Sequence, residues 1–532
     1  MTIERPALTV ETDVLVIGGG MAAAWAAIGA AQAGAEVALV DKGFLGTSGV
    51  TATGGPNHWW VPPDPAERAA AVERRHASSL GLAERSWMHA ILETTWRNLP
   101  RLEGYYPFAA DGSGRTYYSG VRGPEYMRAL RRYAEDLGVR ILDHHPALEL
   151  LLHQDGSVAG AAGYARLDRR DWSARAGAVV LATGGCAFRS GLLGSYNNTG
   201  DGHLLAAEAG AELSGMEFSV SYSLSPVWAS TRTLPYTAAR FYDADGAPLD
   251  IPPPGAGAAH LQGLARALEA GPVYADLEDA PEALRPILRR IQPATPPPFE
   301  RRGLDLFKDR FQVALFGEGT IRGVGGLRIA GEACETTVTG LYAAGDTATR
   351  ELVTGAISGG GSLNSAWALT SGLIAGEAAA GRTARDGRRA DGAAHPAGRA
   401  GLRPAKSARS VDGRAAITLA GTQILEPTKA LWRKAATLDA SRLLLGDLWR
   451  EIADHAGGEA GLPAIAAREA VAVTAMARWC TAAALARAES RGIHQRADAP
   501  ATDPTLAKRL LVGGLDTVWT RFEAFASAEA AA

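Results

Sequence analysis

The sequence predicts an α/β fold organised around one strand–helix–strand unit near the N-terminus, and two patterns indicate this. An apolar, β-prone run (13–17) leads into the triple-glycine turn 18–20, an alanine-rich stretch with high helix propensity follows, and a second apolar run ends in Asp41. A further apolar strand ends in Gly345-Asp346 about 320 residues later and precedes another helical run. Strands that alternate with helices in this way form a mostly parallel sheet covered by helices.

The triple-glycine turn has the features of a dinucleotide-binding site. Gly18 permits the tight turn, Gly20 lets the backbone approach a pyrophosphate, and the helix N-terminus offers unpaired N–H groups to that anion. Asp41 is placed to bind ribose hydroxyls, and Ala23 holds the third glycine position, where alanine is tolerated. The alternative is a glycine turn without a ligand, and this unit alone does not choose between NAD and FAD. The predicted contacts in this unit are Gly18, Gly19, Gly20, Met21, Ala22, Ala23, Asp41 and Lys42.

Length and composition restrict the class of protein. At 532 residues the chain should form two or three domains, since a single core stops growing near about 250–300 residues. The formal net charge is −3, with no basic patch that would indicate nucleic acid. Three distant cysteines without a C-x-x-C pair argue against a metal site, an iron–sulfur cluster or a disulfide framework. No apolar run is long enough for a membrane span, so we expect a soluble, cytoplasmic protein.

A small, glycine-rich loop, 44–55, follows the second strand. It resembles the loop of the succinate dehydrogenase, fumarate reductase, L-aspartate oxidase and adenylylsulfate reductase flavoproteins, which typically read Ser-x-x-Ala-x-Gly-Gly here. Respiratory members carry a histidine in this loop that bonds covalently to FAD, and Ser48 stands at that position. The resemblance therefore implies FAD held non-covalently, with contacts from Ser48, Gly49, Gly54 and Gly55.

Two further motifs support the same resemblance. A buried strand ends in Ala-Thr-Gly-Gly (182–185), and Thr-Gly-Asp-Gly-His (199–203) opens a helix. The resemblance assigns Asp201 to the FAD site, whereas for His203 we favour the interpretation of a helix-start residue. The predicted contacts in this part of the chain are Ala147, Thr183, Gly184 and Asp201.

The second strand–turn–helix, at Gly345-Asp346, decides the choice of cofactor. Its acidic group suits a ribityl hydroxyl, and the stretch 359–364 (Gly-Gly-Gly-Ser-Leu-Asn) opens a helix whose N-terminus would stabilise negative charge on a reduced flavin ring. An enzyme that binds only NAD does not need this second unit, so the sequence predicts FAD. The contacts expected here are Gly345, Asp346, Ser362 and Leu363.

The domain organisation follows from these motifs and from changes in composition. We expect a glutathione-reductase-like FAD-binding domain from residues 1–221 and 325–382, interrupted by an inserted α+β capping domain at 222–324, where prolines cluster. Residues 383–425 are predicted to be a linker and 426–532 a helical bundle. The helical part ends in Glu-Ser-Arg-Gly-x-His-x-Arg-x-Asp (489–498), a strong signature of the C-terminal domain in the same family.

The sequence departs from the family where dicarboxylates are bound. Tyr222 and Ile357 stand where a histidine and an arginine would grip substrate carboxylates, the stretch 321–326 lacks its histidine, and the Arg-Gly-Glu-Gly proton-donor motif of the cap is not visible. An arginine–carboxylate pair is among the stronger polar contacts, so we predict that the substrate is not a C4-dicarboxylate. The glycine loop is more similar to that of adenylylsulfate reductase or ketosteroid dehydrogenases, and the Glu-Ser-Arg-Gly signature favours the former.

Four residues are candidates for catalysis by position alone. Tyr222 is placed to donate a hydrogen bond near the flavin, or else it is a packing aromatic residue. Arg322 and Arg350 flank the second FAD motif and would bind an anionic substrate, unless they are surface arginines. His494 lies in the C-terminal signature, which the family places against the cap and the site.

The sequence thus predicts an FAD-dependent oxidoreductase that moves a hydride between a small organic substrate and the flavin. The alternative is a flavoprotein subunit that relays electrons to an iron–sulfur or ferredoxin-like partner, as in adenylylsulfate reductase. A flavin-free NAD-binding module is a third possibility, against which the second FAD motif argues. Oligomerisation is compatible with the sequence, which does not identify the substrate, the reaction direction or the electron acceptor.

Overall fold

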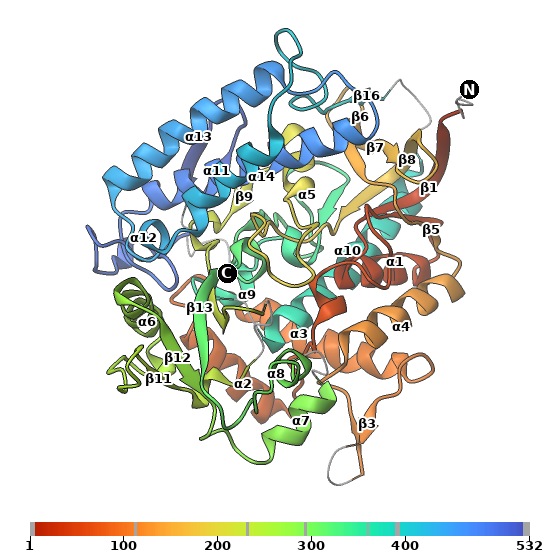
Figure 1. Ribbon diagram of the computed structural model, residues 1–532. Coiled ribbons are helices and arrows are strands. Elements are labelled where there is room, and N and C mark those ends of the chain that lie inside the picture. Colours follow the sequence, from red (N-terminus) through yellow and green to blue (C-terminus); the bar gives the residue numbers. More distant parts are fainter. Residues whose placement is uncertain are drawn as a thin grey trace.

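The N-terminal unit forms as the sequence predicts. In a computed structural model, which describes residues 6–110, 114–229, 234–291, 295–358, 361–388 and 394–524, β1 (Leu8–Ile17) leads through the glycine turn into α1 (Met21–Gln32), and β2 (Val37–Val40) lies parallel to β1. Every residue of β2 is buried, and so is α1 from Met21 to Ala30. The buried residues of this unit belong to the main hydrophobic core, and Figure 1 shows α1 beside α10.

The main sheet has eight strands in the order β16-β6-β7-β8-β1-β2-β5, with β15 paired to β8. The long strand β8 (Arg170–Leu181) pairs in parallel with β1 along one edge. Along its other edge, β8 pairs first with β7 (Val158–Ala165) and then in parallel with β15 (Leu341–Ala343). Strand β15, which follows the capping segment in sequence, thus extends a run of four parallel strands. In spatial order these are β5 (Arg140–Leu142), β2, β1 and β8.

Helix α10 (Ser362–Asp386) crosses α1 unusually closely. A Cβ atom on Gly372 would lie 2.6 Å from the carbonyl oxygen of Ala22, and one on Gly376 would lie 2.0 Å from that of Ala26. Only glycine allows two backbones to approach to this distance. The two helices that follow the two sequence motifs are therefore packed against each other.

The remaining elements of this domain surround the sheet and the two helices. The helices are α2 (Pro65–Ala77), α3 (Arg85–Asn98), α4 (Gly123–Asp136), α5 (Asp201–Glu208) and α9 (Glu351–Thr354). A small hairpin consists of β3 (Ala109–Ala110) and β4 (Thr116–Tyr117), and β6 (Ala147–Leu152) forms a larger hairpin with β7.

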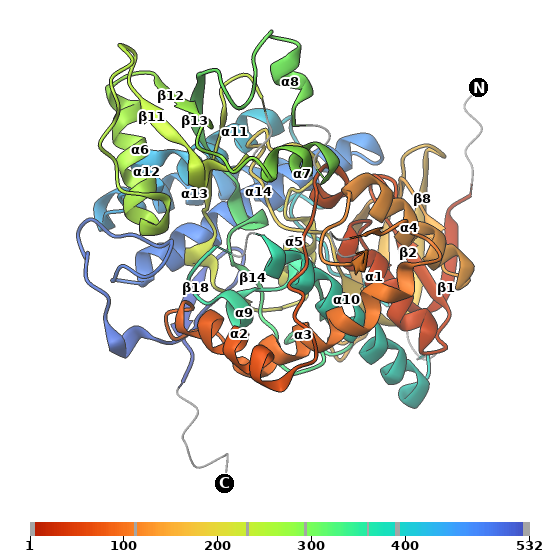
Figure 2. The same ribbon diagram turned by 90° about the horizontal axis from the view of Figure 1, so that it is seen from below.

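The capping segment forms an antiparallel sheet of its own, in the order β10-β13-β12-β11. Its strands are β10 (Tyr222–Pro226), β11 (Arg240–Tyr242), β12 (Val273–Asp276) and β13 (Phe311–Gly317), and its helices are α6 (Ala258–Ala270), α7 (Leu284–Ile291) and α8 (Pro297–Glu300). Residues such as Leu224, Phe299 and Val313 form a separate hydrophobic core. Figure 2 shows this sheet and α6 together on one side of the molecule.

The described parts of the segment predicted to be a linker, 383–388 and 394–425, contain regular elements, so this part of the prediction needs correction. Helix α10 continues to Asp386, β16 (His395–Pro396) adds to the edge of the main sheet at β6, and α11 (Gly413–Leu425) packs against α14. Asp412 caps α11 by accepting a hydrogen bond from the amide of Ala415. The alanine- and arginine-rich composition suggested a flexible chain, whereas buried alanines hold this segment in place.

The C-terminal region contains the expected helices and an unexpected hairpin. Helix α12 (Pro427–Ala430) precedes the two long helices α13 (Ala435–His455) and α14 (Leu462–Ala486), which pack together. The hairpin β17 (Leu510–Gly513) and β18 (Trp519–Phe522) joins β9 (Leu213–Ser214) and β14 (Gly326–Leu327) in a third sheet. Within the described residues, no helix is long and apolar enough to cross a membrane.

Candidate functional site

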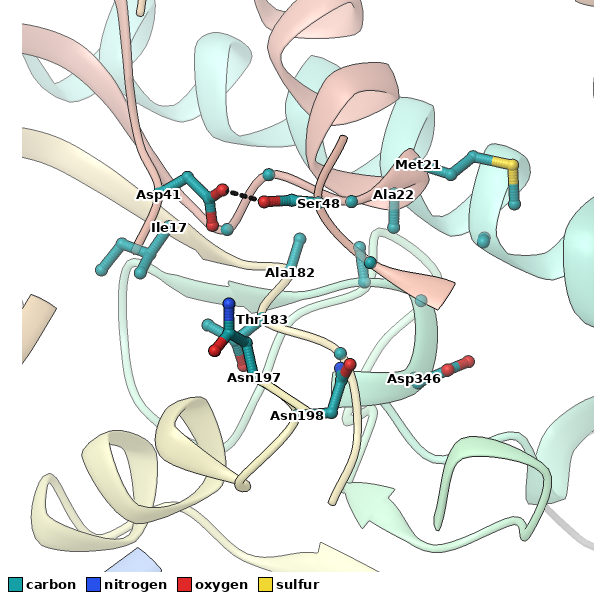
Figure 3. A pocket seen from close by; sticks show the side chains of 18 of the residues that line it. Ile17, Met21, Ala22, Asp41, Ser48, Ala182, Thr183, Asn197, Asn198 and Asp346 are labelled. Atoms are coloured by element: carbon teal, nitrogen blue, oxygen red, sulfur yellow. Dashed lines mark hydrogen bonds between the residues drawn. The ribbon is translucent and has the colours of Figure 1, made fainter. Parts of the chain in front are cut away.

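A narrow cavity opens where the parallel strands β1, β2, β8 and β15 end, which is where open α/β sheets bind ligands. It continues past the start of α1 to the first turn of α10, and Figure 3 shows its labelled side chains. The cavity is lined by Ile17, Gly18, Gly19, Gly20, Met21, Ala22, Val40, Asp41, Lys42, Ser48, Gly49, Val50, Thr51, Pro146, Ala147, Ala182, Thr183, Gly184, Asn197, Asn198, Asp201, Leu205, Ala344, Gly345, Asp346, Asn364, Ser365 and Ala368.

The glycines of the two motifs fit a long, thin ligand. Gly18 has a φ of +129°, and a Cβ atom there would lie 2.2 Å from the carbonyl oxygen of Ala182. A Cβ atom on Gly345 would lie 2.6 Å from the Cβ of Ala22, so the first and second motifs touch directly. A Cβ atom on Gly20, in contrast, would meet no atom of the described residues within 4 Å. Space for a diphosphate therefore remains beside the N-terminus of α1, where the free amides point.

Asp41 directly follows β2 and is 7% exposed. Its carboxylate accepts a hydrogen bond from the hydroxyl of Ser48 (Figure 3). Burial raises the pKa of Asp41, although the bond from Ser48 and the amide of Gly43 oppose this shift. The ribose hydroxyls of a dinucleotide would supply further donors to this buried group.

Lys42 and Asp201 form one wall of the cavity. The Nζ of Lys42 lies 2.6 Å from Asp201 Oδ2, 3.0 Å from Glu469 Oε1 and 2.8 Å from Thr199 Oγ1. Burial alone would raise the pKa of Asp201, but the charge of Lys42 and the bonds from Lys42 and Thr199 lower it below its usual value. The salt bridge ties β2 to α5 and to α14, so the C-terminal helices help to shape the cofactor cavity.

Both terminal nitrogens of the Arg350 guanidinium group are engaged within the protein, which favours a structural role over the expected binding of an anionic substrate. It is 1% exposed, and its Nη1 lies 2.5 Å from Asp346 Oδ1 and 3.0 Å from the carbonyl oxygen of Ile321. It also donates to the side chain of Asn364 and to the carbonyls of Thr320 and Gly323. Burial raises the pKa of Asp346, while the positive charge of Arg350 opposes this shift. Arg350 thus holds Asp346 and the start of α10 in fixed positions.

Several predicted cofactor contacts do not line the cavity. Ala23 is fully buried in α1, and Gly54 and Gly55 follow the lining loop 48–51 without taking part in the lining. Ser362 and Leu363 start α10 but line a neighbouring cavity instead. Gly359 and Gly360, which belong to the same predicted motif, lie outside the described residues.

Sequence reasoning missed five polar residues of the lining, of which Thr51 lies in the glycine-rich loop and the other four form two pairs. Asn197 and Asn198 come directly before the Thr-Gly-Asp-Gly-His motif, and Asn364 and Ser365 come directly after Ser362-Leu363. Each pair adjoins a motif that was recognised. Helix periodicity beyond the motif would have placed Asn364 and Ser365 in the first turn of α10, but no sequence signal placed 197–198 opposite Asp41.

Tyr222 and Arg322 are both engaged within the protein. The hydroxyl of Tyr222 donates a 2.7 Å hydrogen bond to the carbonyl oxygen of Leu425, at the end of α11, and burial raises the pKa of Tyr222 further above its usual range. This contact favours a packing role rather than the expected role as a donor near the flavin. Arg322 lies 2.8 Å from the fully buried carboxylate of Glu318, and its side chain is 31% exposed.

His494 is buried in a cluster of charged residues, away from the lining of the cavity. Its Nδ1 accepts from Arg433, and its Nε2 lies 3.0 Å from the carbonyl oxygen of Arg487. Burial and the charge of Arg433 hold the pKa of His494 well below its usual value, so the ring stays neutral. This geometry gives His494 a structural role in place of the expected catalytic one.

Comparison with known proteins agrees with the geometry of the cavity. A family model described as an FAD binding domain matches residues 13–233, and one described as the fumarate reductase flavoprotein C-terminus matches residues 435–520. L-aspartate oxidase of Mycobacterium tuberculosis is 28% identical over 551 residues, which cover 96% of this chain and 97% of that protein. Other curated relatives, fumarate and urocanate reductases, match over 230 to 246 residues, about 40% of their own length.

Solved structures share the whole fold. A mutant of the Escherichia coli quinol fumarate reductase FrdA superposes with a TM-score of 0.78 at 22% identity and covers 97% of both chains. Adenylylsulfate reductase of Archaeoglobus fulgidus superposes with a TM-score of 0.75 at 18% identity and covers 98% of this chain and 97% of that one.

The cavity and these matches define an FAD-binding oxidoreductase. Its glycine turns, the buried Asp41, the half-buried Asp346 and the open space beside Gly20 fit FAD. The chain carries an FAD binding domain and a fumarate reductase flavoprotein C-terminal domain, and it is similar to an L-aspartate oxidase over nearly its whole length.

Proposed function

We propose that this oxidoreductase transfers a hydride between a small organic substrate and FAD that is bound without a covalent link. FAD supplies the hydride chemistry when it is bound. The observation that carries the proposal is the direct contact between the two motifs at Ala22 and Gly345, which joins the dinucleotide half of the cavity to the half that ends at α10. The first turn of α10 directs backbone amides at that end, where negative charge on a reduced ring would be stabilised.

Non-covalent binding is supported by the chemistry of the cavity lining. The described lining contains no histidine, cysteine or tyrosine, so it offers no side chain of the kind that bonds to the flavin ring. Ser48, at the position of the family histidine, has its hydroxyl bonded to Asp41 instead.

A substrate other than a C4-dicarboxylate is supported by the residues that replace the family clamp. Tyr222 is bonded to Leu425, Ile357 carries no charge, and the stretch 321–326 offers the side chain of Arg322 as its only cation. We propose Arg322, partly exposed and paired with Glu318 at the end of β13, as the residue of this stretch that contacts an anionic group. The full-length similarity to an L-aspartate oxidase is the argument for a dicarboxylate, so aspartate belongs in the test.

The test is the anaerobic visible spectrum of the purified protein before and after addition of succinate or L-aspartate. Acid precipitation of the same sample then separates free from covalent flavin. We expect a yellow protein that releases FAD into the supernatant and is not bleached by either acid. Flavin retained in the pellet would contradict non-covalent binding, and bleaching by either acid would contradict the substrate assignment.

A second candidate function is electron relay within a complex that contains an iron–sulfur partner. Two observations favour it: one curated relative is named as one of the subunits of a fumarate reductase, and the adenylylsulfate reductase structure matches nearly the whole chain. Purification from the native host without an affinity tag tests it. A stoichiometric ferredoxin-like chain in the flavin-containing fraction would support the relay, and turnover by the isolated chain with a small-molecule acceptor would support the first function.

A further inference from the structure

A second cavity, of about 300 Å³, lies next to the cofactor cavity at the first turn of α10. It is lined by Trp59, Ala71, Arg74, Arg75, Ser78, Ser362 and Leu363, and we call it the Arg75 cavity. A volume of this size holds a small organic anion but not a nucleotide. The next two residues of α10, Asn364 and Ser365, line the FAD cavity, so one helical turn borders both cavities.

The buried nitrogens of the Arg75 guanidinium group lack partners among the described residues. Its Nε and Nη2 atoms donate to no hydrogen-bond acceptor in that part of the chain. Glu73, the acidic residue nearest to Arg75 in the sequence of this helix, is paired with Arg85 instead. Arg85 donates hydrogen bonds of 2.6 and 2.9 Å to the Glu73 carboxylate. Burial lowers the pKa of Arg75, and no carboxylate of the described residues counteracts this shift. Arg75 as a whole is only partly buried, but the two buried guanidinium nitrogens without an acceptor are costly, and an anion that binds them would remove that cost.

The remaining lining matches an anion as well. Arg74 adds a second positive charge, Ser78 and Ser362 add hydroxyl groups, and no acidic side chain belongs to the described lining. Trp59 forms an apolar wall and is held against α10, because its amide donates a 3.0 Å hydrogen bond to the carbonyl oxygen of Ser362. Figure 2 shows that α2, which carries both arginines, runs along the edge of the molecule beside α9.

We propose that the Arg75 cavity binds an oxyanion, namely the carboxylate, sulfonate or phosphate group of the substrate. This inference rests on the proposed function, since it places the anionic end of the substrate one helical turn from the flavin end of the cofactor cavity. It also provides a cation at a place where none was predicted from the sequence. Arg75 is the primary contact, and Arg74 supplies additional charge.

The experiment titrates the FAD-loaded protein with sodium acetate, methanesulfonate and phosphate at constant ionic strength. Two signals are followed, the tryptophan fluorescence and the visible spectrum of the flavin. We expect saturable binding of at least one of the three anions, and the tightest of them identifies the anionic group. Arg75→Gln should weaken binding at least tenfold, and Arg75→Lys should weaken it less, because the positive charge remains.

Two further variants make the test specific. Arg128→Gln removes a largely exposed arginine of α4 and should leave anion binding unchanged. Trp59→Phe should remove most of the fluorescence change while the flavin signal still saturates. Arg75→Gln should also unfold at no lower temperature than the wild type, because its buried nitrogens have no hydrogen bond within the described chain to lose.

Three results would overturn the inference: no saturable anion binding, binding that Arg75→Gln leaves unchanged, or a marked loss of thermal stability in Arg75→Gln. Failure of the proposed function looks different, because the purified protein would then carry no FAD. A yellow protein whose anion binding does not depend on Arg75 contradicts this inference alone.

Discussion

The cofactor cavity and the buried charges beneath the C-terminal signature are held together in different ways. The cavity depends on backbone approach: Gly18, Gly345 and Gly376 stand where a Cβ atom would overlap another chain segment. The second region, which we call the Arg487 cluster, depends on side-chain charge. It comprises Glu217, Arg433, Arg487, Glu489, Arg491 and His494, all buried.

The Arg487 cluster joins segments that are far apart in the sequence. Arg487 lies 2.7 Å from Glu217 Oε1 and 2.9 Å from Glu489 Oε1, and Arg491 donates to the carbonyl oxygen of Leu80. Gly492 sits so close to the loop before α10 that a Cβ atom would lie 2.0 Å from the carbonyl oxygen of Ala356. Steric exclusion thus defines the cofactor site, whereas mutual neutralisation of buried charge fixes the C-terminal region against it.

The largest effect is expected from Gly18→Ala. The new methyl group would lie 2.2 Å from the carbonyl oxygen of Ala182, and the φ of +129° is unfavourable for alanine. This overlap can be removed only if β1 and β8 separate at the mouth of the cavity. We expect the affinity for flavin, measured by flavin titration, to fall more than about 100-fold. The free energy of unfolding, measured in urea, should fall by about 3 kcal/mol or more.

Two matched alanine variants separate steric from cofactor effects. A Cβ atom on Gly20 would meet no protein atom, so Gly20→Ala should keep the stability of the flavin-free protein while it weakens flavin binding. Gly104→Ala, also in open space, should change neither. Equal stability losses in Gly18→Ala and Gly20→Ala would contradict the steric account.

Arg487→Met tests whether paired buried charges stabilise the Arg487 cluster. The side chain is fully buried, and its removal leaves Glu217 and part of Glu489 without their cation. Breaking a buried pair from one side costs about 3–5 kcal/mol, because an uncompensated charge remains. We expect that loss in urea unfolding, with flavin affinity of the folded protein changed by less than about threefold.

The double variant Glu217→Gln/Arg487→Met is the control for the single variant Arg487→Met. It removes both charges of the pair and should recover at least half of the lost stability. A stability loss in Arg487→Met below about 1 kcal/mol, or no recovery in the double variant, would show that the cluster is not held by charge.

Glu351 gives this region a pH dependence. Burial, followed by the charge of Glu217, raises the pKa of Glu351 to about 7 from an ordinary value of 4.5. Between these values the folded protein holds a proton that the unfolded chain releases, so stability falls as the pH rises through this window and stays lower above pH 7. Glu351→Gln removes this titration and should keep the hydrogen bond from Ser214.

Urea unfolding at pH 5.5 and pH 8 measures the effect. The wild type should lose about 1–3 kcal/mol more than Glu351→Gln between the two pH values. An identical change with pH in both proteins would mean that Glu351 is charged in the folded state at pH 5.5.

The smallest effect is expected from Tyr222→Phe. The variant loses one hydrogen bond, from the hydroxyl to the carbonyl oxygen of Leu425, which ties the base of the cap to the end of α11. We expect a loss of about 0.5–1.5 kcal/mol and an unchanged flavin spectrum. A spectral change without a loss of stability would instead place the hydroxyl against the flavin.

The sequence was sufficient to predict the FAD-binding half of the molecule because its signals are local. The turn at Gly18–Gly20, the acid at Asp41 and the Gly345-Asp346 pair each combine a backbone requirement with a neighbouring strand or helix, and the cavity contains all of them. The family resemblance, carried by short motifs, is confirmed by matches to both ends of the chain.

The roles of the candidate catalytic residues could not be predicted from local motifs, because these roles depend on partners elsewhere in the chain. Nothing near Arg350 in the sequence shows that the carbonyls of 320–323 surround its guanidinium group. Likewise, the partners of His494 lie on residues 433 and 487, and that of Tyr222 lies more than 200 residues away. Alanine-rich composition also concealed α11, since its buried face is made of small residues that do not stand out from a linker.

The pairing of β15 with β8 has a consequence for how the protein is made. A ribosome releases β1, α1 and β8 early, yet Gly345, Asp346 and the first turn of α10 emerge only after the entire capping segment has been synthesised. The capping segment has its own hydrophobic core and is able to fold in the meantime. Nascent chains arrested before residue 345 should therefore fail to retain FAD, and the cofactor joins the protein late in translation or after its completion.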